Sequence, residues 1–173
     1  MRASATRARG APDGHSREGI LRRARPAVHF GTLVFLLPLV ACSLPRWPAA
    51  GPLSSPFGLR TGGFFLDLHR GVDIDVPDGT EVRAMVRGRV RFAGHMAGYG
   101  RVVWLDHPGA LLTVYAHLSA IHVAAGEEVR NGQVIGLSGH SGDVTGPHLH
   151  FEVWRHGREV DPVTFLGGFP PGG

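Results

Sequence analysis

The chain has 173 residues, which is enough for one ordinary domain and an additional segment. Its 26 glycines and 13 prolines follow no fixed period, which excludes a collagen-like fibre, and a hydrophobic content of 43% is enough for a buried core. A single cysteine, Cys42, excludes an internal disulfide framework and a cysteine-rich zinc module.

Positive charge is concentrated in the N-terminal part of the chain. All 18 basic residues are arginines. Residues 1–41 contain seven arginines and two acidic residues, whereas residues 42–173 contain eleven arginines and twelve acidic residues. The second part is close to neutral and lacks the excess of basic residues that a nucleic-acid-binding face requires, so we expect no nucleic-acid partner.

Residues 1–41 are predicted to be a signal peptide with a disordered N-terminal extension. Residues 1–27 are rich in Arg, Ala, Gly and Pro and have no apolar period. Residues 28–40 form an uncharged apolar run, which is shorter than the roughly 20 residues that a membrane-spanning helix needs. A basic stretch followed by a short apolar run is typical of a secretory signal.

The apolar run ends in Leu39-Val40-Ala41-Cys42, which resembles a bacterial lipobox. In a lipobox the cysteine becomes the lipid-modified first residue of the mature protein; the alternative is a signal peptide with an incidental cysteine. We expect lipidation at Cys42, attachment to the membrane through that anchor, and export to the periplasm as an outer-membrane lipoprotein. Residues 42–53 would then be the lipidated cysteine and a Pro-rich tether.

Residues 54–166 are predicted to form an all-β domain, and residues 167–173 a flexible Gly/Pro tail. No window of the domain has a sustained apolar pattern at helical period, and glycines recur every few residues between short β-rich runs. The expected strands are residues 81–92, 101–107, 110–117, two short strands within 128–137, and 148–155. The Pro-Gly pair at 108–109 favours a hairpin. We expect an antiparallel sandwich or partial barrel with an active-site groove on the sheet.

Histidines in four contexts are the candidates for chemistry. His69 and Asp73 are separated by Gly71 and a β-branched residue, which favours an extended or turning segment over a helix. His117 ends a predicted strand. His148 and His150 are two residues apart in a predicted strand and therefore project from one face.

Two imidazoles on one strand face suit one metal ligand and one base beside the metal. Together with the other candidates they fit an open zinc site, in which three protein ligands leave the fourth position to water and the zinc lowers the pKa of that water toward 7.

The ordered set of motifs resembles the LytM/lysostaphin-type zinc metallopeptidases of family M23, over nearly the whole of residues 54–166. The matching segments are SPFGLR (55–60), HRGVDID (69–75), GTEVRA (79–84), YAHL (115–118), GEEVRNGQ (126–133) and GPHLHFE (146–152).

The resemblance implies one Zn²⁺ per chain, with His69, Asp73 and His150 as its ligands and His117 and His148 as catalytic residues. It implies a zinc endopeptidase that hydrolyses peptide cross-links of bacterial peptidoglycan, with a cell-wall protein activator as a further candidate partner. Some members carry a tyrosine shortly before the first ligand, and this chain has Gly62, Gly63, Phe64 and Phe65 there.

Other interpretations differ in what they require of the sequence. A non-catalytic cell-wall regulator that activates an amidase would be expected to lack ligands, and none is missing. A lipoyl or biotinyl carrier needs a lysine, and the chain has none. A metal-storage lipoprotein would not need two additional histidines. The remaining histidines 95, 107, 122 and 156 are expected at the surface, His140 is a weaker candidate for the groove, and Asp75 is expected beside the ligands or at a sheet edge.

Overall fold

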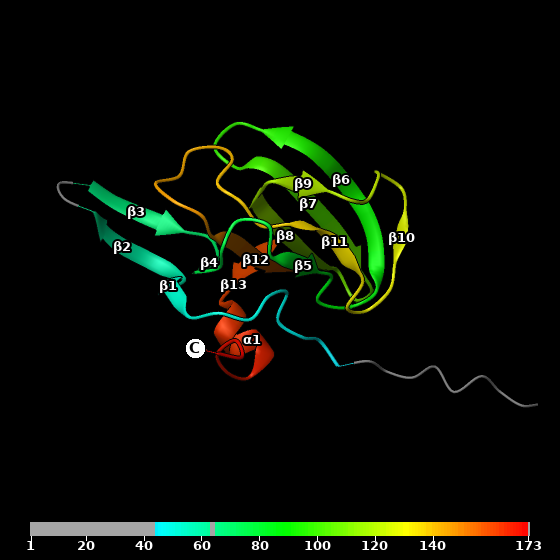
Figure 1. Ribbon diagram of the computed structural model, residues 1–173. Coiled ribbons are helices and arrows are strands. Elements are labelled where there is room, and N and C mark those ends of the chain that lie inside the picture. The colour runs from blue at the N-terminus through cyan, green and yellow to red at the C-terminus, as the bar shows by residue number, and fades with distance from the viewer. Residues whose placement is uncertain (1–43, 63–64, 173) are drawn as a thin grey trace, which may run out of the picture. The chain divides into compact units, whose positions relative to one another are not determined.

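The structure is a computed structural model, which describes residues 44–62 and 65–172 (Figure 1). The predicted signal peptide and Cys42 lie outside the described residues. Apart from one short helix, the regular secondary structure of the described part consists of antiparallel strands, which confirms the predicted all-β fold. Within it, no helix combines the length and the apolar character needed to cross a membrane.

An eight-stranded antiparallel sheet forms the larger layer, in the order β1-β4-β12-β8-β7-β6-β10, with β13 paired to β12. In sequence order its strands are β1 (Leu53–Ser55), β4 (Val72–Ile74), β6 (Gly88–Met96), β7 (Gly100–His107), β8 (Leu111–Leu118), β10 (Glu128–Val129), β12 (Leu149–Arg155) and β13 (Arg158–Val160). The hairpin expected around the Pro-Gly turn is confirmed as the β7–β8 pair.

A three-stranded sheet of β5 (Glu81–Arg83), β11 (Val134–Leu137) and β9 (Ala120–Ile121) forms the smaller layer. Val82 and Ile135 from this sheet belong to the same buried cluster as Leu105, Tyr115 and Phe151 from the large sheet. The main core therefore lies between the two sheets. The members of both buried clusters and the residues packed against them lie between positions 47 and 166, so residues 43–173 contain this whole core.

The large sheet also carries apolar residues on its other face. Because side chains alternate along a strand, Val103 and Leu105 of β7 enter the main core while Val102 and Trp104 belong to a second cluster on the opposite side. Val114 and Ala116 of β8 complete the buried part of that second cluster. One sheet thus has a fully covered face and a face with partly exposed aromatic residues.

A hairpin of β2 (Gly58–Gly62) and β3 (Phe65–His69) extends from the body of the domain, and the helix α1 (Pro162–Leu166) lies at the opposite end of the chain (Figure 1). The Asp161 side chain caps α1 by accepting from the Val163 N–H, and Pro162 occupies the first turn, where no intrahelical donor is needed.

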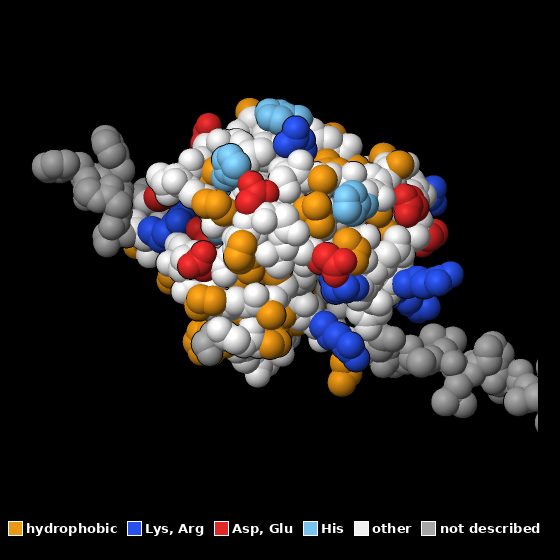
Figure 2. All heavy atoms as spheres, in the orientation of Figure 1, with side chains coloured by type: hydrophobic (Ala, Val, Ile, Leu, Met, Phe, Trp, Pro, Cys, Tyr) orange, Lys and Arg blue, Asp and Glu red, His pale blue; other side chains and the backbone are white. Residues whose placement is uncertain are grey.

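Figure 2 shows charges of both signs interspersed over the face in view.

One strand prediction differs from the structure. Residues 81–92 were expected as one strand, but they form β5 and β6, which lie in different sheets. The break occurs at Met85, which is fully buried and whose N–H donates to the Tyr115 hydroxyl at 2.9 Å. The two short strands expected within residues 128–137 are present as β10, which joins the large sheet, and β11, which joins the small one.

From Arg46 onward, the segment expected as a Pro-rich tether is packed against the domain. The Arg46 N–H donates to the Met85 carbonyl at 3.0 Å, and Ala49 is buried in the core. Trp47 packs against Phe151 with a ring-centroid distance of 6.1 Å, so the segment gains burial that a solvated tether would not have.

The tail expected to be flexible is also packed against the domain. The Trp47 Nε1–H donates to the Gly168 carbonyl at 3.1 Å, and Pro170 is buried. The first and last described segments therefore hold one another against the domain, which composition alone did not indicate.

Candidate metal centre

His69, Asp73 and His150 meet because two strands pair across the sheet. Asp73 of β4 lies directly opposite His150 of β12, and His69 ends β3 just before the turn into β4. Gly71 in that turn is required by space, since a Cβ there would lie 2.2 Å from the Phe151 carbonyl oxygen. The glycine thus lets the chain pass close enough to β12 for the three side chains to converge.

The three side chains form a tight cluster. His69 Nε2 lies 3.1 Å from Asp73 Oδ1 and 3.0 Å from His150 Nδ1, and His150 Nδ1 lies 2.8 Å from the same Oδ1. All three ligand atoms lie within 4.8 Å of one another. His69 and His150 are buried, and Asp73 is partly buried.

The outward ring nitrogens of the two histidines are held by hydrogen bonds, and this determines which nitrogens face the cluster. His69 Nδ1 donates to the Pro56 carbonyl at 2.7 Å, and His150 Nε2 donates to Glu152 Oε1 at 2.9 Å. When both rings are neutral, as metal ligands must be, their inward nitrogens are lone-pair acceptors that face a carboxylate. Two acceptors and an anion at these distances attract a shared cation, and a donor set of two imidazoles and one carboxylate is of the kind that suits Zn²⁺.

The ionisation of the cluster agrees with this geometry. Burial disfavours the charged form of Asp73, but hydrogen bonds with His150 and His69 outweigh it and hold its pKa well below the usual range. Burial lowers the pKa of His150, but hydrogen bonds with Asp73 and Glu152 outweigh it and raise that pKa to about 8. The cluster is thus an anionic site that attracts a proton or a metal ion.

Glu152 was not identified as a candidate from the sequence, although it is two residues after His150 and therefore on the same strand face. It is 1% exposed and accepts from His150 Nε2, from the Tyr99 hydroxyl at 2.8 Å and from Trp154 Nε1 at 2.6 Å. Burial raises its pKa, but hydrogen bonds with His150, Trp154 and Tyr99 lower it overall, so it is a carboxylate. Its role is to fix the ring of His150.

Tyr99 reaches the same cleft from the turn between β6 and β7. Its ring lies edge-on to His150 at 5.9 Å, and burial together with the Glu152 charge raises its pKa to about 12. The sequence showed no tyrosine shortly before His69, but the fold brings this hydroxyl to the cleft from a segment 30 residues later. The Tyr99 hydroxyl is placed there by pairing between strands that are distant in the sequence, and no local motif indicates it.

His117 and His148 lie beside the cluster. Their rings are 4.8 Å apart, and His117 is 5.8 Å from His150. Each Nδ1 donates to a backbone carbonyl at 2.9 Å, His117 to Ser141 and His148 to Gly146, so each Nε2 is left without a backbone partner. Both residues line the same cleft as the three clustered side chains.

Two features distinguish His117. Burial, which outweighs the hydrogen bond to Ser141, lowers its pKa to about 4, so the ring is neutral at neutral pH. Its backbone has a φ of 61°, a left-handed conformation that costs energy for a residue with a side chain and recurs at functional sites. The Tyr99 carbonyl accepts from the His117 N–H at 2.9 Å and holds this conformation.

The cleft has a volume of about 640 Å³ and is bordered by the β2–β3 hairpin and the loop at residues 143–145. Arg60 lies on the hairpin side, with its guanidinium 3.5 Å from Asp73 Oδ2 and hydrogen-bonded to the Ser55 hydroxyl at 3.0 Å. Arg60 therefore contacts the carboxylate oxygen that the two histidines leave free.

The remaining candidates lie elsewhere. His107 was expected at the surface, but it is buried; its Nδ1 donates to the Arg87 carbonyl at 2.9 Å and its Nε2 lies 2.7 Å from the Thr113 hydroxyl. His140 is exposed and pairs with Asp78 at 2.8 Å, away from the cleft. His95, His122 and His156 are exposed, as expected. Asp75, which was expected beside the ligands or at a sheet edge, is also exposed.

An antiparallel β fold with a His–Asp–His cluster and two further histidines in one cleft defines a protein with a metallopeptidase-like site. Residues 67–162 match peptidase family M23, and the chain belongs to this family. The resemblance inferred from the motifs is thereby confirmed.

Three curated relatives show the range of the family. The DD-carboxypeptidase/endopeptidase Mpg of Neisseria meningitidis is 46% identical over 114 residues, which are 65% of this chain and 26% of Mpg. The murein hydrolase activator EnvC of Escherichia coli is 38% identical over 122 residues, which are 70% of this chain and 28% of EnvC. The outer membrane antigenic lipoprotein B of Haemophilus influenzae is 36% identical over 130 residues, which are 75% of this chain and 31% of the lipoprotein.

A solved structure, described as a zinc containing peptidase from Vibrio cholerae, is similar with a TM-score of 0.64 and 32% identity, covering 73% of this chain and 39% of that one. The chain spans less than a third of the length of the three curated relatives. These relatives include an enzyme, an activator of other enzymes and a lipoprotein.

Proposed function

We propose that this chain is a zinc-dependent endopeptidase that hydrolyses peptide cross-links of bacterial peptidoglycan. The observation that carries the proposal is the complete set of groups in one cleft: three clustered side chains that fit Zn²⁺ and two histidines whose Nε2 atoms have no backbone partner. The similarity to Mpg, which is named as an endopeptidase, supports the reaction class.

His69, Asp73 and His150 would hold the metal. Zinc, when bound, activates water for attack and polarises the scissile carbonyl. Glu152 and the Pro56 carbonyl fix the two imidazole rings so that the nitrogens facing the cluster keep their lone pairs free. The cleft is thus arranged in advance, and substrate binding need not reorient its ligands.

His117 and His148 would manage the protons of the reaction. Because Nδ1 of each ring is held by a backbone carbonyl, Nε2 is the atom available for proton transfer. The neutral state of His117, which follows from its lowered pKa, allows its Nε2 to accept a proton. His148 Nε2 lies 3.8 Å from Asp73 Oδ1 and so borders the cluster without belonging to it.

A second candidate function is regulation of another cell-wall hydrolase, because the chain is 38% identical to the activator EnvC over 122 residues. The presence of all five groups favours the enzyme over the regulator. A cell-wall amidase would be the partner in the second case, and the same purified protein can be tested for both functions.

We further propose that Cys42 carries a lipid anchor and that the protein acts in the periplasm, attached to the outer membrane. The Leu-Val-Ala-Cys sequence at residues 39–42 supports lipidation. The similarity to a Haemophilus protein named as an outer membrane lipoprotein supports the location. Stable attachment needs more than one acyl chain, which lipoprotein processing supplies.

The deciding experiment incubates residues 43–173 with isolated sacculi, with and without a chelator, and identifies released muropeptides by mass spectrometry. Chelator-sensitive release of cleaved cross-links supports the endopeptidase, and the mass of the product identifies the bond. Release only after an amidase is added would overturn the enzyme proposal in favour of the regulator. His150→Ala serves as the matched control for contaminating hydrolases.

A further inference from the structure

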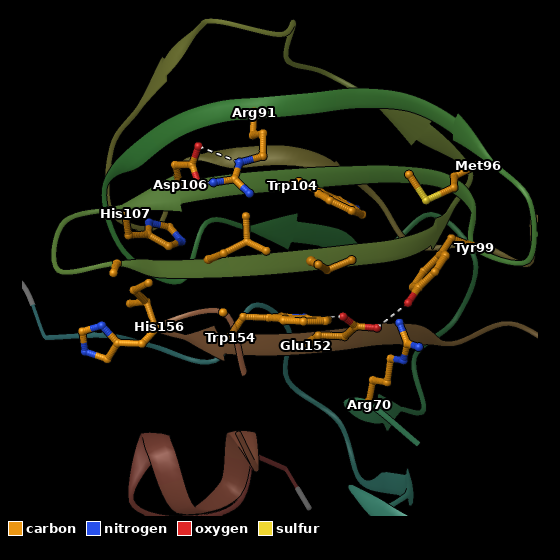
Figure 3. A pocket seen from close by; sticks show the side chains of 15 residues that line it. Arg70, Arg91, Met96, Tyr99, Trp104, Asp106, His107, Glu152, Trp154 and His156 are labelled. Carbon is orange, nitrogen blue, oxygen red and sulfur yellow. Dashed lines mark hydrogen bonds and ion pairs between the residues drawn. The ribbon is translucent and has the colours of Figure 1, made fainter. Parts of the chain in front are cut away.

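A second cavity lies beside the metal cleft, on the outer face of the large sheet (Figure 3). It has a volume of about 640 Å³. We call it the aromatic groove and define it by six of its lining residues: Met96, Tyr99, Trp104, Leu112, Val114 and Trp154. It is the exposed side of the second apolar cluster, whose buried floor is formed by β7 and β8.

Two tryptophans flank the strand at the centre of this groove. Trp104 of β7 pairs with Val114 of β8, and Trp154 of β12 pairs with Leu112 of the same strand. The two tryptophans therefore lie on either side of β8 and are offset by two residues along it, which places their backbones roughly 12 Å apart. Both indoles are only partly buried, so part of each ring surface is available to a ligand.

The aromatic groove is continuous with the metal cleft. Arg70, Tyr99 and Glu152 line both cavities. Glu152 joins them directly, because it accepts from His150 on one side and from Trp154 on the other. Trp154 follows His150 by four residues in one strand, which places it roughly 13 Å along the sheet. A ligand that fills both cavities would thus be an extended chain.

The lining of the groove carries no net charge. It contains two arginines, Arg70 and Arg91, and two acidic residues, Asp106 and Glu152. Arg91 is paired with Asp106 through two contacts of 2.9 and 2.6 Å, and Glu152 is occupied by its three donors. Arg70 is paired with Glu159 at 3.7 Å, so a charged peptide would find each of the four charged side chains already paired. An uncharged ligand with an apolar face and polar edges would suit both the indoles and the rim.

A pyranose ring has this character, because its axial C–H bonds form an apolar face and its hydroxyl and acetamido groups a polar edge. Flat apolar faces pack on aromatic rings, and the rim side chains Arg91 and Asp106 provide donors and acceptors beside them. The backbone separation of the two tryptophans is of the order of the length of a disaccharide.

We propose that the aromatic groove binds the sugar rings of the peptidoglycan glycan strand while the peptide cross-link lies in the metal cleft. This proposal rests on the proposed function, which supplies the polymer in which sugars and cross-links are joined. The groove would select cross-links by the glycan to which they are attached.

The test uses the three tryptophans as separate reporters. A β-1,4-linked N-acetylglucosamine oligomer is titrated into ¹⁵N-labelled residues 43–173 in the presence of chelator, and the indole N–H signals are followed by NMR. Signals of Trp104 and Trp154 should shift, whereas Trp47, which lies away from the groove and donates to Gly168, should not. A glycan-free stem peptide is the second probe and should leave the indoles of the groove unchanged.

Variants give a second measurement. Trp104→Leu should weaken saccharide binding about 2- to 10-fold, the range for one aromatic contact. Phe169→Leu, which removes an exposed aromatic ring outside the groove, is the matched control and should not change that affinity. Leu112→Gln removes apolar surface but no ring and should also weaken binding, which keeps the test valid if Trp104→Leu does not fold.

The outcomes separate this proposal from the proposed function. Hydrolysis of sacculi without saccharide binding, or indole shifts caused only by the stem peptide, would overturn the glycan groove and leave the peptidase. Saccharide binding without hydrolysis of sacculi would overturn the peptidase and leave the groove. Equal shifts of all three indole signals would indicate non-specific association and would also overturn the groove.

Discussion

Glu152 provides the sharpest test of how the metal centre is built. Replacing it with alanine removes the acceptor that fixes the His150 ring and leaves the buried His150 donor and the half-buried Tyr99 and Trp154 donors without this partner. Loss of such an outer-shell carboxylate typically costs about 10- to 100-fold in metal affinity, which corresponds to roughly 1.4–2.7 kcal/mol. We expect Glu152→Ala to bind zinc more weakly by this factor while keeping all three ligands.

Glu152→Gln should have a smaller effect for a geometric reason. Its amide oxygen can still accept from His150 Nε2 and the Tyr99 hydroxyl, which both contact Oε1. Its amide NH₂ would instead face the Trp154 Nε1–H, which contacts Oε2 at 2.6 Å, and two donors repel. We therefore expect a zinc affinity between that of the original protein and that of Glu152→Ala.

The assay is competition for zinc against a chromogenic chelator, with the stability of the metal-free proteins measured in parallel by urea unfolding. Glu128→Ala, which removes an exposed glutamate on β10, is the matched control and should bind zinc as the original protein does. Unchanged zinc affinity in a folded Glu152→Ala protein would refute the positioning role of Glu152.

Other expected outcomes follow from the same structure. His69→Ala should lose most of its zinc affinity, since an open site has only three protein ligands, and metal analysis after dialysis would check this. His117→Ala and His148→Ala should keep zinc but lose about 10²–10⁴-fold in turnover on sacculi; zinc loss in either would make that residue a ligand. Burial outweighs a hydrogen bond to the Arg87 carbonyl and lowers the pKa of His107 below its ordinary 6.5. The folded state therefore favours the neutral ring, and the free energy of unfolding should fall as the pH drops below 6.5. Urea unfolding above and below that pH should show a weaker pH dependence of stability in His107→Gln. Cys42→Ala should release the protein from the outer membrane or block its processing, and unchanged membrane fractionation would contradict the lipobox.

Local periodicity accounts for what the sequence determined by itself. The alternation in residues 148–155 placed His148 and His150 on one face and Leu149 and Phe151 on the other, and both phenylalanine and leucine are fully buried in the core. Side-chain direction in a strand depends only on position parity, so no partner strand is needed to predict it. The same holds for the β7–β8 hairpin, which depends on a local Pro-Gly turn.

Pairing between distant segments decided the rest. His69 and His150 are 81 residues apart, and only the β4–β12 register brings their ring nitrogens to 3.0 Å. Tyr99 and Glu152 meet for the same reason, and their hydrogen bond has no local signature.

Burial likewise depends on what the fold places over a residue. Trp47 was expected within a tether, but it packs on Phe151. His107 was expected at the surface, but it is enclosed between Arg87 and Thr113. Residue type and position along a strand specify which face of the sheet a side chain occupies. Which other segment covers that face depends on tertiary contacts, and the order of residues in the sequence does not reveal these contacts.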